Sequence, residues 1–269
     1  MTQLPACAVC GSAARPPFRP PPAELAPDLD GRPGEPTRST LPKWIATCRR
    51  CGASGPDLSR LPDGTADVVR GAAYQALRVP GPDKPALRWA LVCSALDRRA
   101  EAAEATLQAA WALDDAASGP GAAPSDPAPP GPTSSGPTSS GPTSSGPMSS
   151  GQASLSATQP GLADAATLRR RAVSLWGPPQ GTEDALRQVD ILRRAGDFAG
   201  ASVLADALDS APLDENSAAI LAFQRARTAD GNAGRQLLSS ALRPPARRPH
   251  VTHGTQAQAS GFWRRLLGG

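Results

Sequence analysis

Apolar residues recur three and four positions apart within residues 63–117, and this spacing predicts two amphipathic helices. Their sequences are "PALRWALVCSALDRR" and "AEAAEATLQAAWALDD". The first helix should bury a face made of Leu87, Leu91 and Ala95. The second should bury Ala103, Leu107, Ala110 and Trp111. Because only Asp97 to Arg99 separates the two helices, we expect an antiparallel helical hairpin.

The same spacing returns in residues 161–243 and predicts five further helices there. Their sequences are "LADAATLRRRAVSLW", "TEDALRQVDILRRAG", "DFAGASVLADALDSAP", "ENSAAILAFQRARTAD" and "AGRQLLSSALR". In the second of these helices, Thr182 is the expected N-cap and Gly196 lies just past the expected end. Residues 161–243 should therefore form a second helical unit.

One turn in this unit carries a family resemblance. The sequence "RRAGDFAGASVLADAL" is similar to the middle of a tetratricopeptide repeat, in which a glycine, an acidic or amide residue and an aromatic make the turn between paired helices. Gly196, Asp197 and Phe198 match these positions, and Ala201 matches the small residue at which the two helices approach each other. No clean 34-residue period runs through the chain, so the resemblance implies degenerate repeats.

Three segments lack the helical period. Residues 118–160 contain "GPTSSGPTSSGPTSSGPMSSG", which cannot bury enough apolar surface to fold, and predict a disordered linker. We expect this linker to separate the two helical parts into units that move independently. Residues 1–62 are rich in proline and predict a loop that carries a short hairpin between two pairs of cysteines. Residues 244–269 predict a basic, flexible tail.

The amino-acid composition also favours a helical fold. The chain has only ten aromatic residues, so its core must depend on alanine and leucine, which favour helices over sheets. The N-terminus lacks the features of a signal peptide, and stretches such as "AAILAF" are far shorter than a membrane span. We therefore predict a cytoplasmic all-α protein, with tetratricopeptide-like hairpins preceded by a small metal-binding module.

Two Cys-x-x-Cys-Gly sequences predict that metal-binding module. They are "CAVCG", with Cys7 and Cys10, and "CRRCG", with Cys48 and Cys51. Each turn offers two thiolates to one ion, and four thiolates are the closed tetrahedral set that zinc prefers in structural sites. One zinc site would join the two pairs of cysteines across the 37 residues between Cys10 and Cys48. Cys93, within a predicted helix, is expected to be a small buried apolar residue.

Two families resemble this arrangement. Paired Cys-x-x-Cys-Gly turns with Trp44 before the second pair are similar to rubredoxin, which implies an iron electron-transfer module as an alternative. The sequence "CRRCG", then "DLSRL", "AAWALDDA" and "DILRRAGDF", resembles an uncharacterised bacterial family of zinc-ribbon proteins with tetratricopeptide-like helices. That resemblance covers most of the chain. It implies a cytoplasmic, non-enzymatic zinc-binding scaffold for protein–protein interaction, with a zinc ribbon and helical repeats.

The distribution of charged residues bears on whether the cysteine module binds nucleic acid. The net charge of +4 equals that of residues 244–269, whereas residues 1–75 hold nine basic and seven acidic side chains. A nucleic-acid-binding zinc ribbon therefore has weak electrostatic support, although Arg49 and Arg50 lie within the second cysteine turn.

No catalytic constellation is evident. The two histidines, His250 and His253, lie in the polar tail, where a metal role is a lesser alternative to a solvated segment. Asp114 and Asp115 are neighbours on a helix, so their side chains should point apart at a solvated helix end. The tail ends in an amphipathic segment that can dock on a protein partner or make weak contact with a membrane surface. Its residues are Phe262, Trp263, Arg264, Arg265, Leu266 and Leu267.

Overall fold

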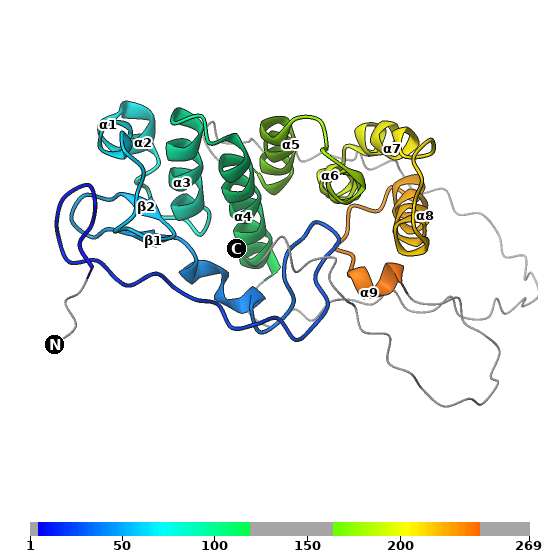
Figure 1. Ribbon diagram of the computed structural model, residues 1–269, viewed down its shortest axis with the longest axis horizontal. Helices are drawn as coiled ribbons and strands as arrows, with labels where there is room; N and C mark the ends of the chain where they lie inside the picture. The colour runs from blue at the N-terminus through cyan, green and yellow to red at the C-terminus, as the bar shows by residue number, and fades with distance from the viewer. Residues whose placement is uncertain (1–4, 119–163, 243–269) are drawn as a thin grey trace, which may run out of the picture.

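The computed structural model describes residues 5–118 and 164–242 and is mainly helical, with 53% of these residues in helices and 4% in strands (Figure 1). This confirms the predicted mainly-α class. The N-terminal part contains η1 (Arg38–Lys43), β1 (Ala46–Thr47), β2 (Ser54–Gly55), α1 (Thr65–Arg70) and α2 (Ala72–Ala76). The helical array follows with α3 (Lys84–Ala95), α4 (Arg99–Ser118), α5 (Ala165–Trp176), α6 (Thr182–Arg194), α7 (Phe198–Ala207), α8 (Glu215–Ala229) and α9 (Leu238–Ala241).

Helices α3 and α4 form the expected hairpin. Asp97 has a φ of 56° in the turn, and the Arg98 amide donates to the Cys93 carbonyl at 2.8 Å. The predicted buried face of α4 is correct, but that of α3 is not, because Leu87 and Leu91 are only half-buried and Ala95 is exposed. The apolar side chains that α3 buries are Ala86, Trp89, Ala90, Val92 and Cys93. The reason is that α3 packs on α4 and also on β2 and α1, which a single predicted stripe could not anticipate.

Helices α4 and α5 pack directly on each other, although the long linker separates them in sequence. Leu107 and Trp111 of α4 share one apolar cluster with Ala172 of α5 and Ile191 of α6. The expectation that the two helical parts move independently was therefore wrong, because one core crosses the junction. The linker itself lies outside the described residues, except for Ser118 at the end of α4.

The turn between α6 and α7 has the predicted residues in the predicted places. Gly196 follows α6 with a φ of 70°, and Asp197 caps α7 by accepting a 2.9 Å hydrogen bond from the Gly200 amide. Ala201 is fully buried where α7 approaches α6. The N-cap of α6 differs from the prediction, since Gly181 holds that position and Thr182 is the first helical residue, with no side-chain cap.

The last predicted helix is much shorter than expected, because only Leu238–Ala241 is helical. The residues before it run alongside the N-terminal loop instead. The Leu29 amide donates to the Gln236 carbonyl at 3.0 Å, and the Leu238 amide donates to the Pro27 carbonyl at 2.9 Å. These backbone hydrogen bonds remove residues 236 and 237 from a helical path.

The N-terminal loop thus returns to the far part of the array, and we call residues 27–38 the strap. Residues 28–34 are buried without a break, and Leu29 joins the apolar core formed by α6, α7 and α8. Gly31 has a φ of 87°, and a Cβ there would lie 2.6 Å from Nε of Arg187, so only glycine fits. The hairpin expected between the cysteine pairs is absent from the strap. The two short strands instead flank the second pair, with Thr47 opposite Ser54.

Candidate metal centre

The two cysteine turns are built alike. Ala6 pairs with Ala13 and Thr47 pairs with Ser54, so each turn is closed by a pair that starts one residue before its first cysteine. The glycine after each turn has a left-handed φ, 68° at residue 11 and 79° at residue 52. In both turns this glycine donates its amide to the carbonyl of the first cysteine, at 2.8 and 2.9 Å. The repeated Cys-x-x-Cys-Gly sequence therefore gives two copies of one local structure.

The four sulfur atoms lie together. All of them are within 4.8 Å of one another, with 3.8 Å between Cys7 and Cys51 and 3.7 Å between Cys10 and Cys48. A tetrahedral ion with metal–sulfur bonds of about 2.3 Å requires sulfur–sulfur separations of about 3.8 Å. The cluster could therefore hold one metal ion, as predicted for these four residues.

Backbone amides stabilise charge on these sulfurs. Burial disfavours the Cys48 thiolate, but the amides of Cys51 and Arg50 and the Ser12 hydroxyl outweigh it and lower the pKa of Cys48 to about 6. Burial and, to a smaller extent, the neighbouring sulfurs together raise the pKa of Cys51 to about 12. Hydrogen bonds from Ser12 also lower the pKa of Cys10, so the thiolates of Cys48 and Cys10 are favoured over those of Cys7 and Cys51. Four adjacent thiolates need a cation to offset their repulsion.

Several supporting residues escaped sequence reasoning. Oγ of Ser12 lies 3.1 Å from the sulfur of Cys10 and 3.4 Å from that of Cys48. Tyr74, the one tyrosine of the chain, is fully buried; its hydroxyl accepts from the Ser54 amide at 2.9 Å and donates to the Gly52 carbonyl at 3.0 Å. Ser12 stands two residues after a cysteine, which was the available signal. Tyr74 had none, because it lies on a separate helix.

The fifth cysteine and the two arginines of the second cysteine turn lie outside the sulfur cluster. Cys93 is fully buried outside the four-sulfur cluster, and burial raises the pKa of its thiol to about 12, so it behaves as the expected apolar residue. Arg49 and Arg50 are exposed at the tip of the second turn. The histidines at 250 and 253 and the amphipathic residues 262–267 lie outside the described residues.

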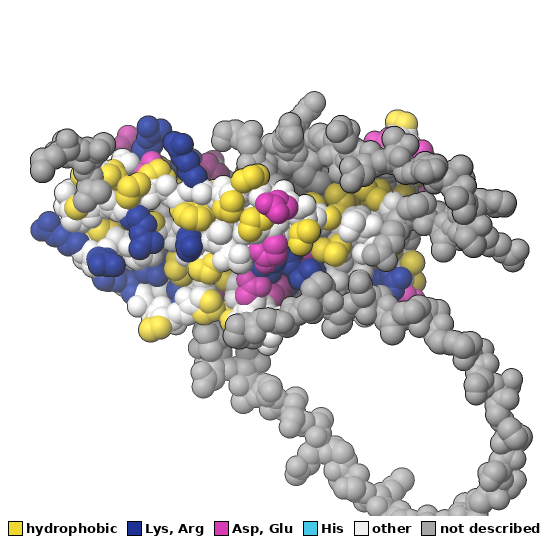
Figure 2. Space-filling view, turned by 90° about the horizontal axis from the view of Figure 1, so that it is seen from below, with side chains coloured by type: hydrophobic (Ala, Val, Ile, Leu, Met, Phe, Trp, Pro, Cys, Tyr) yellow, Lys and Arg dark blue, Asp and Glu magenta, His cyan; other side chains and the backbone are white. Residues whose placement is uncertain are grey.

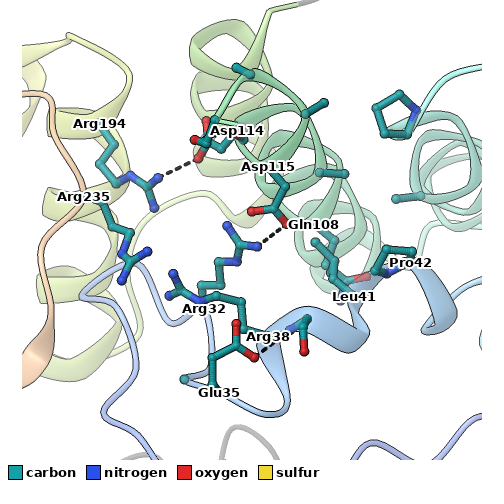
Figure 3. A pocket seen from close by; sticks show the side chains of 18 of the residues that line it. Arg32, Glu35, Arg38, Leu41, Pro42, Gln108, Asp114, Asp115, Arg194 and Arg235 are labelled. Carbon is teal, nitrogen blue, oxygen red and sulfur yellow. Dashed lines mark hydrogen bonds and ion pairs between the residues drawn. The ribbon is translucent and has the colours of Figure 1, made fainter. Parts of the chain in front are cut away.

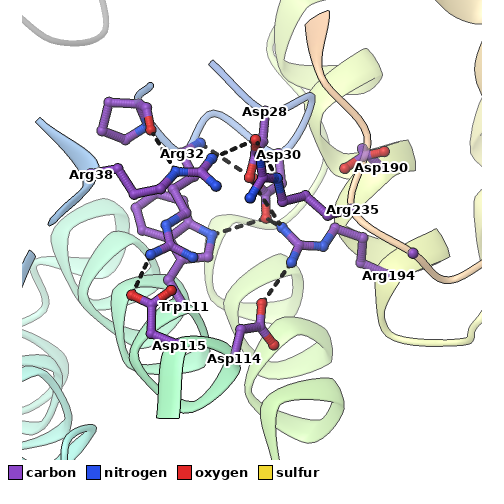
Figure 4. A network of polar contacts seen from close by, with 12 residues as sticks. Asp28, Asp30, Arg32, Arg38, Trp111, Asp114, Asp115, Asp190, Arg194 and Arg235 are labelled. Carbon is purple, nitrogen blue, oxygen red and sulfur yellow. Dashed lines mark hydrogen bonds and ion pairs between the residues drawn. The ribbon is translucent and has the colours of Figure 1, made fainter. Parts of the chain in front are cut away.

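A second polar cluster lies where the strap meets the helices (Figure 4). Asp30 is fully buried, accepts from Nε1 of Trp111 at 2.9 Å, and pairs with the guanidinium of Arg194. Burial opposes the charge of Asp30, but Arg194 and Arg169 hold the pKa of this carboxyl below its usual range. Asp30 lies in the strap, Trp111 in α4, Arg169 in α5 and Arg194 in α6. The contacts of Asp30 therefore connect the strap to three helices.

At Asp28, burial and like charge outweigh the neighbouring arginines. Burial and the neighbouring charge of Asp30 raise the pKa of Asp28 to about 6, although Arg38 and Arg235 oppose this shift. The carboxylate lies 2.5 Å from Arg38 and 3.2 Å from Arg235. Its environment thus favours the neutral form more than that of Asp30 does.

Asp114 and Asp115 complete this network. Their side chains do not converge on one site, but the expected solvated helix end was wrong for Asp114, which accepts from Arg169 at 2.5 Å and from Arg194 at 2.6 Å. Asp115 is half-exposed and pairs with Arg32 of the strap. Sequence neighbours on α4 are therefore held by arginines from α5, α6 and the strap.

Two cavities flank this junction. The larger, of about 1190 Å³, lies between the strap and the C-terminal half of α4, and Figure 3 shows Arg32, Arg38 and Arg235 around it. The smaller, of about 910 Å³, lies between the N-terminal loop, α4, the end of α5 and the start of α6. Gln108 of α4 and Ile45 of the N-terminal loop line both cavities.

Among the described residues, no helix is long and apolar enough to cross a membrane. Comparison with known proteins gives no relative from which a role could be transferred: no family model, no curated protein and no solved structure matches this chain.

Proposed function

We propose that this chain is a non-enzymatic zinc-binding scaffold for protein–protein interaction. The observation that carries the proposal is the closed set of four sulfurs at separations suited to one tetrahedral ion. Four protein ligands leave no coordination position for a substrate, which is typical of structural rather than catalytic zinc. The ion would hold a zinc ribbon, and helices with a tetratricopeptide-like turn at Gly196 would supply the partner surface. This function agrees with the resemblance to bacterial zinc-ribbon proteins.

The ribbon's dependence on metal follows from its small core. Residues 5–62 bury few large apolar side chains, chiefly Leu29, Leu41, Leu58 and Leu61, and Leu29 belongs to the core of the distant helices. A segment with so little apolar surface gains much of its folding free energy from the ion.

Elemental analysis and native mass spectrometry of the full chain test the metal assignment. We expect one zinc per chain, lost in C48S/C51S and retained in C93S, which removes a buried thiol outside the cluster. A red protein with visible absorption would support the rubredoxin-like alternative, because the same four sulfurs suit iron. A metal-free protein with normal folding would overturn the proposal.

A nucleic-acid-binding zinc ribbon is the second candidate. Asp28 and Asp30 are buried in this region, but so are Arg32 and Arg38, so its exposed surface keeps the small basic excess that its composition gives. Figure 2 shows Lys and Arg side chains gathered at the end of the molecule that carries the cysteines. Arg49 and Arg50 are exposed there.

Salt-dependent binding of the full chain to a DNA or RNA oligonucleotide tests this candidate. Binding that R49E/R50E abolishes, with zinc content unchanged, would favour the nucleic-acid function over the scaffold. If neither the native chain nor R49E/R50E binds the oligonucleotide at low salt, the nucleic-acid function is excluded.

A further inference from the structure

We propose that the smaller cavity is a groove for an extended, lysine- or arginine-bearing segment of a partner protein. This inference rests on the proposed scaffold function and names the chemistry of the partner. The cavity measures about 910 Å³, which has room for several side chains. It lies beside the strap along the N-terminal half of α4, where Glu101 is exposed and Glu104 and Gln108 are half-buried, so it is a recess in the helical face that would receive the partner.

Aromatic side chains gather in this groove. The whole chain has ten aromatic residues, and four of them line it. They are Phe18, Trp44, Trp89 and Trp176. The sequential prolines 20, 21 and 22 form one wall. Tryptophans and prolines present large surfaces that lose little conformational freedom when a ligand binds, and tryptophan is enriched at interaction hot spots.

Carboxylates accompany these rings. Glu101 and Glu104 of α4 and Asp184 of α6 line the groove, whereas Arg187 is the one basic lining residue in the described part of the chain. Arg187 is itself buried: it donates to the Asp30 carbonyl and Glu104 at 2.8 Å each. Asp184 makes no ion pair with any described residue, and Glu101 pairs only at the surface with Arg98. The groove therefore favours a cationic ligand and disfavours a phosphate backbone.

The same rings already hold cations of this chain. Arg187 lies over Trp176 at 4.8 Å, Lys43 over Phe18 at 5.6 Å and Arg98 over Trp89 at 5.7 Å. Such distances are typical of cation–π contacts. Trp44 is the exception, since no cation lies over its ring among the described residues. Its Nε1 donates to Oγ1 of Thr40 at 2.8 Å, which orients the ring. We assign the Trp44 ring to a lysine or arginine of the partner.

Fluorescence anisotropy of the full, metal-loaded chain tests this assignment with a defined probe. The probe is a fluorescein-labelled nonapeptide of alternating Arg and Leu, and the same peptide with Glu in place of Arg is the control. We expect the cationic peptide alone to bind. E101Q/D184N should weaken its binding about tenfold, since Glu101 is exposed and Asp184 is half-buried, and each such carboxylate contributes modestly. E183Q/E215Q, which removes two exposed carboxylates outside the groove, should leave binding unchanged.

A second pair of variants separates stacking from charge. W44F keeps a ring and should retain most of the affinity, whereas W44L should lose about as much as E101Q/D184N. If all variants bind the cationic peptide equally, or if the acidic peptide binds, the proposal that this groove receives a cationic segment is wrong. If R264E/R265E binds the probe more tightly, basic residues of the chain itself compete for the groove, and the assignment to a separate partner is overturned.

Metal content of the same samples keeps the two proposals apart. Failure of the probe to bind a protein with one zinc per chain would overturn the groove and leave the zinc scaffold standing. Absence of metal from a folded protein would overturn the scaffold itself.

Discussion

The N-terminal loop is fixed at two places by two different kinds of interaction. At its ends, four cysteines from two copies of one short sequence come within 4.8 Å of one another. In its middle, the strap is fixed by aspartates and arginines that come from α4, α5, α6 and residue 235. The first is a local motif repeated twice, and the second is a network that exists only after the array has folded.

This difference explains what the sequence could predict. Cysteine spacing identifies a metal cluster because each turn is complete within about seven residues. The arginines at 169, 187 and 194 look like the polar faces of amphipathic helices, yet all three are buried or nearly so. Nothing in their local sequence distinguishes a solvated arginine from one that pairs with a strap 130 or more residues away.

Metal removal should have the largest effect. Structural zinc contributes on the order of 10 kcal/mol to the folding of small zinc modules. We expect a strong chelator to unprotect the amides of both cysteine turns in hydrogen exchange, whereas α6, α7 and α8 stay protected. Addition of zinc should restore protection. Unchanged exchange around Cys48 after verified metal loss would show that the turns fold without the ion.

Neutralising Asp30 should have the next largest effect. D30N removes the nearest strap partner of the buried Arg194 guanidinium, which then keeps Asp114 and the more distant Asp28. Breaking a buried pair of this kind costs about 3–5 kcal/mol. Denaturant unfolding at constant zinc measures this change. D67N is the control, because Asp67 and its partner Arg70 are both exposed, so the loss of that ion pair should cost less than about 1 kcal/mol. Equal costs for the two variants would contradict a buried ionic strap.

Asp28 should give the strap a pH dependence. Its pKa is raised from 3.8 to about 6, so between pH 4 and 6 the folded state binds more protons than the unfolded state. Stability from this group is therefore present below pH 4 and falls as the pH rises to 6, by about 1–3 kcal/mol. Relative to the native chain, D28N should gain stability over this window in denaturant titrations. A constant difference between the two proteins would show that Asp28 is ionised throughout.

Tyr74 should give the smallest effect. Y74F removes a hydroxyl that bonds the Ser54 amide and the Gly52 carbonyl behind the second cysteine turn. Loss of these bonds should cost about 1–2 kcal/mol and lower zinc affinity without changing stoichiometry. Competition with a zinc-binding dye measures that affinity, and F223Y, which adds a hydroxyl remote from the cysteines, is the control. Equal affinities would remove Tyr74 from the support of the metal site.

Sequence reasoning succeeded where one element determines its own structure. The mainly helical class, the α3–α4 hairpin and the turn at Gly196 followed from periodicity and turn residues. It failed where a second segment intervened: the last helix is shortened because residues 236 and 237 pair with the strap, and α3 turns a different face inward because β2 packs on it. The proline-rich loop was predicted to carry a short hairpin, whereas its charged residues Asp28, Asp30, Arg32 and Arg38 are buried against the helical array.

X-ray absorption spectroscopy of the metal-loaded full chain tests the central claim most directly. We expect a zinc edge with four sulfur neighbours at about 2.3 Å and no oxygen or nitrogen ligand. A spectrum with two or three sulfurs and a light-atom ligand would contradict a closed four-cysteine site.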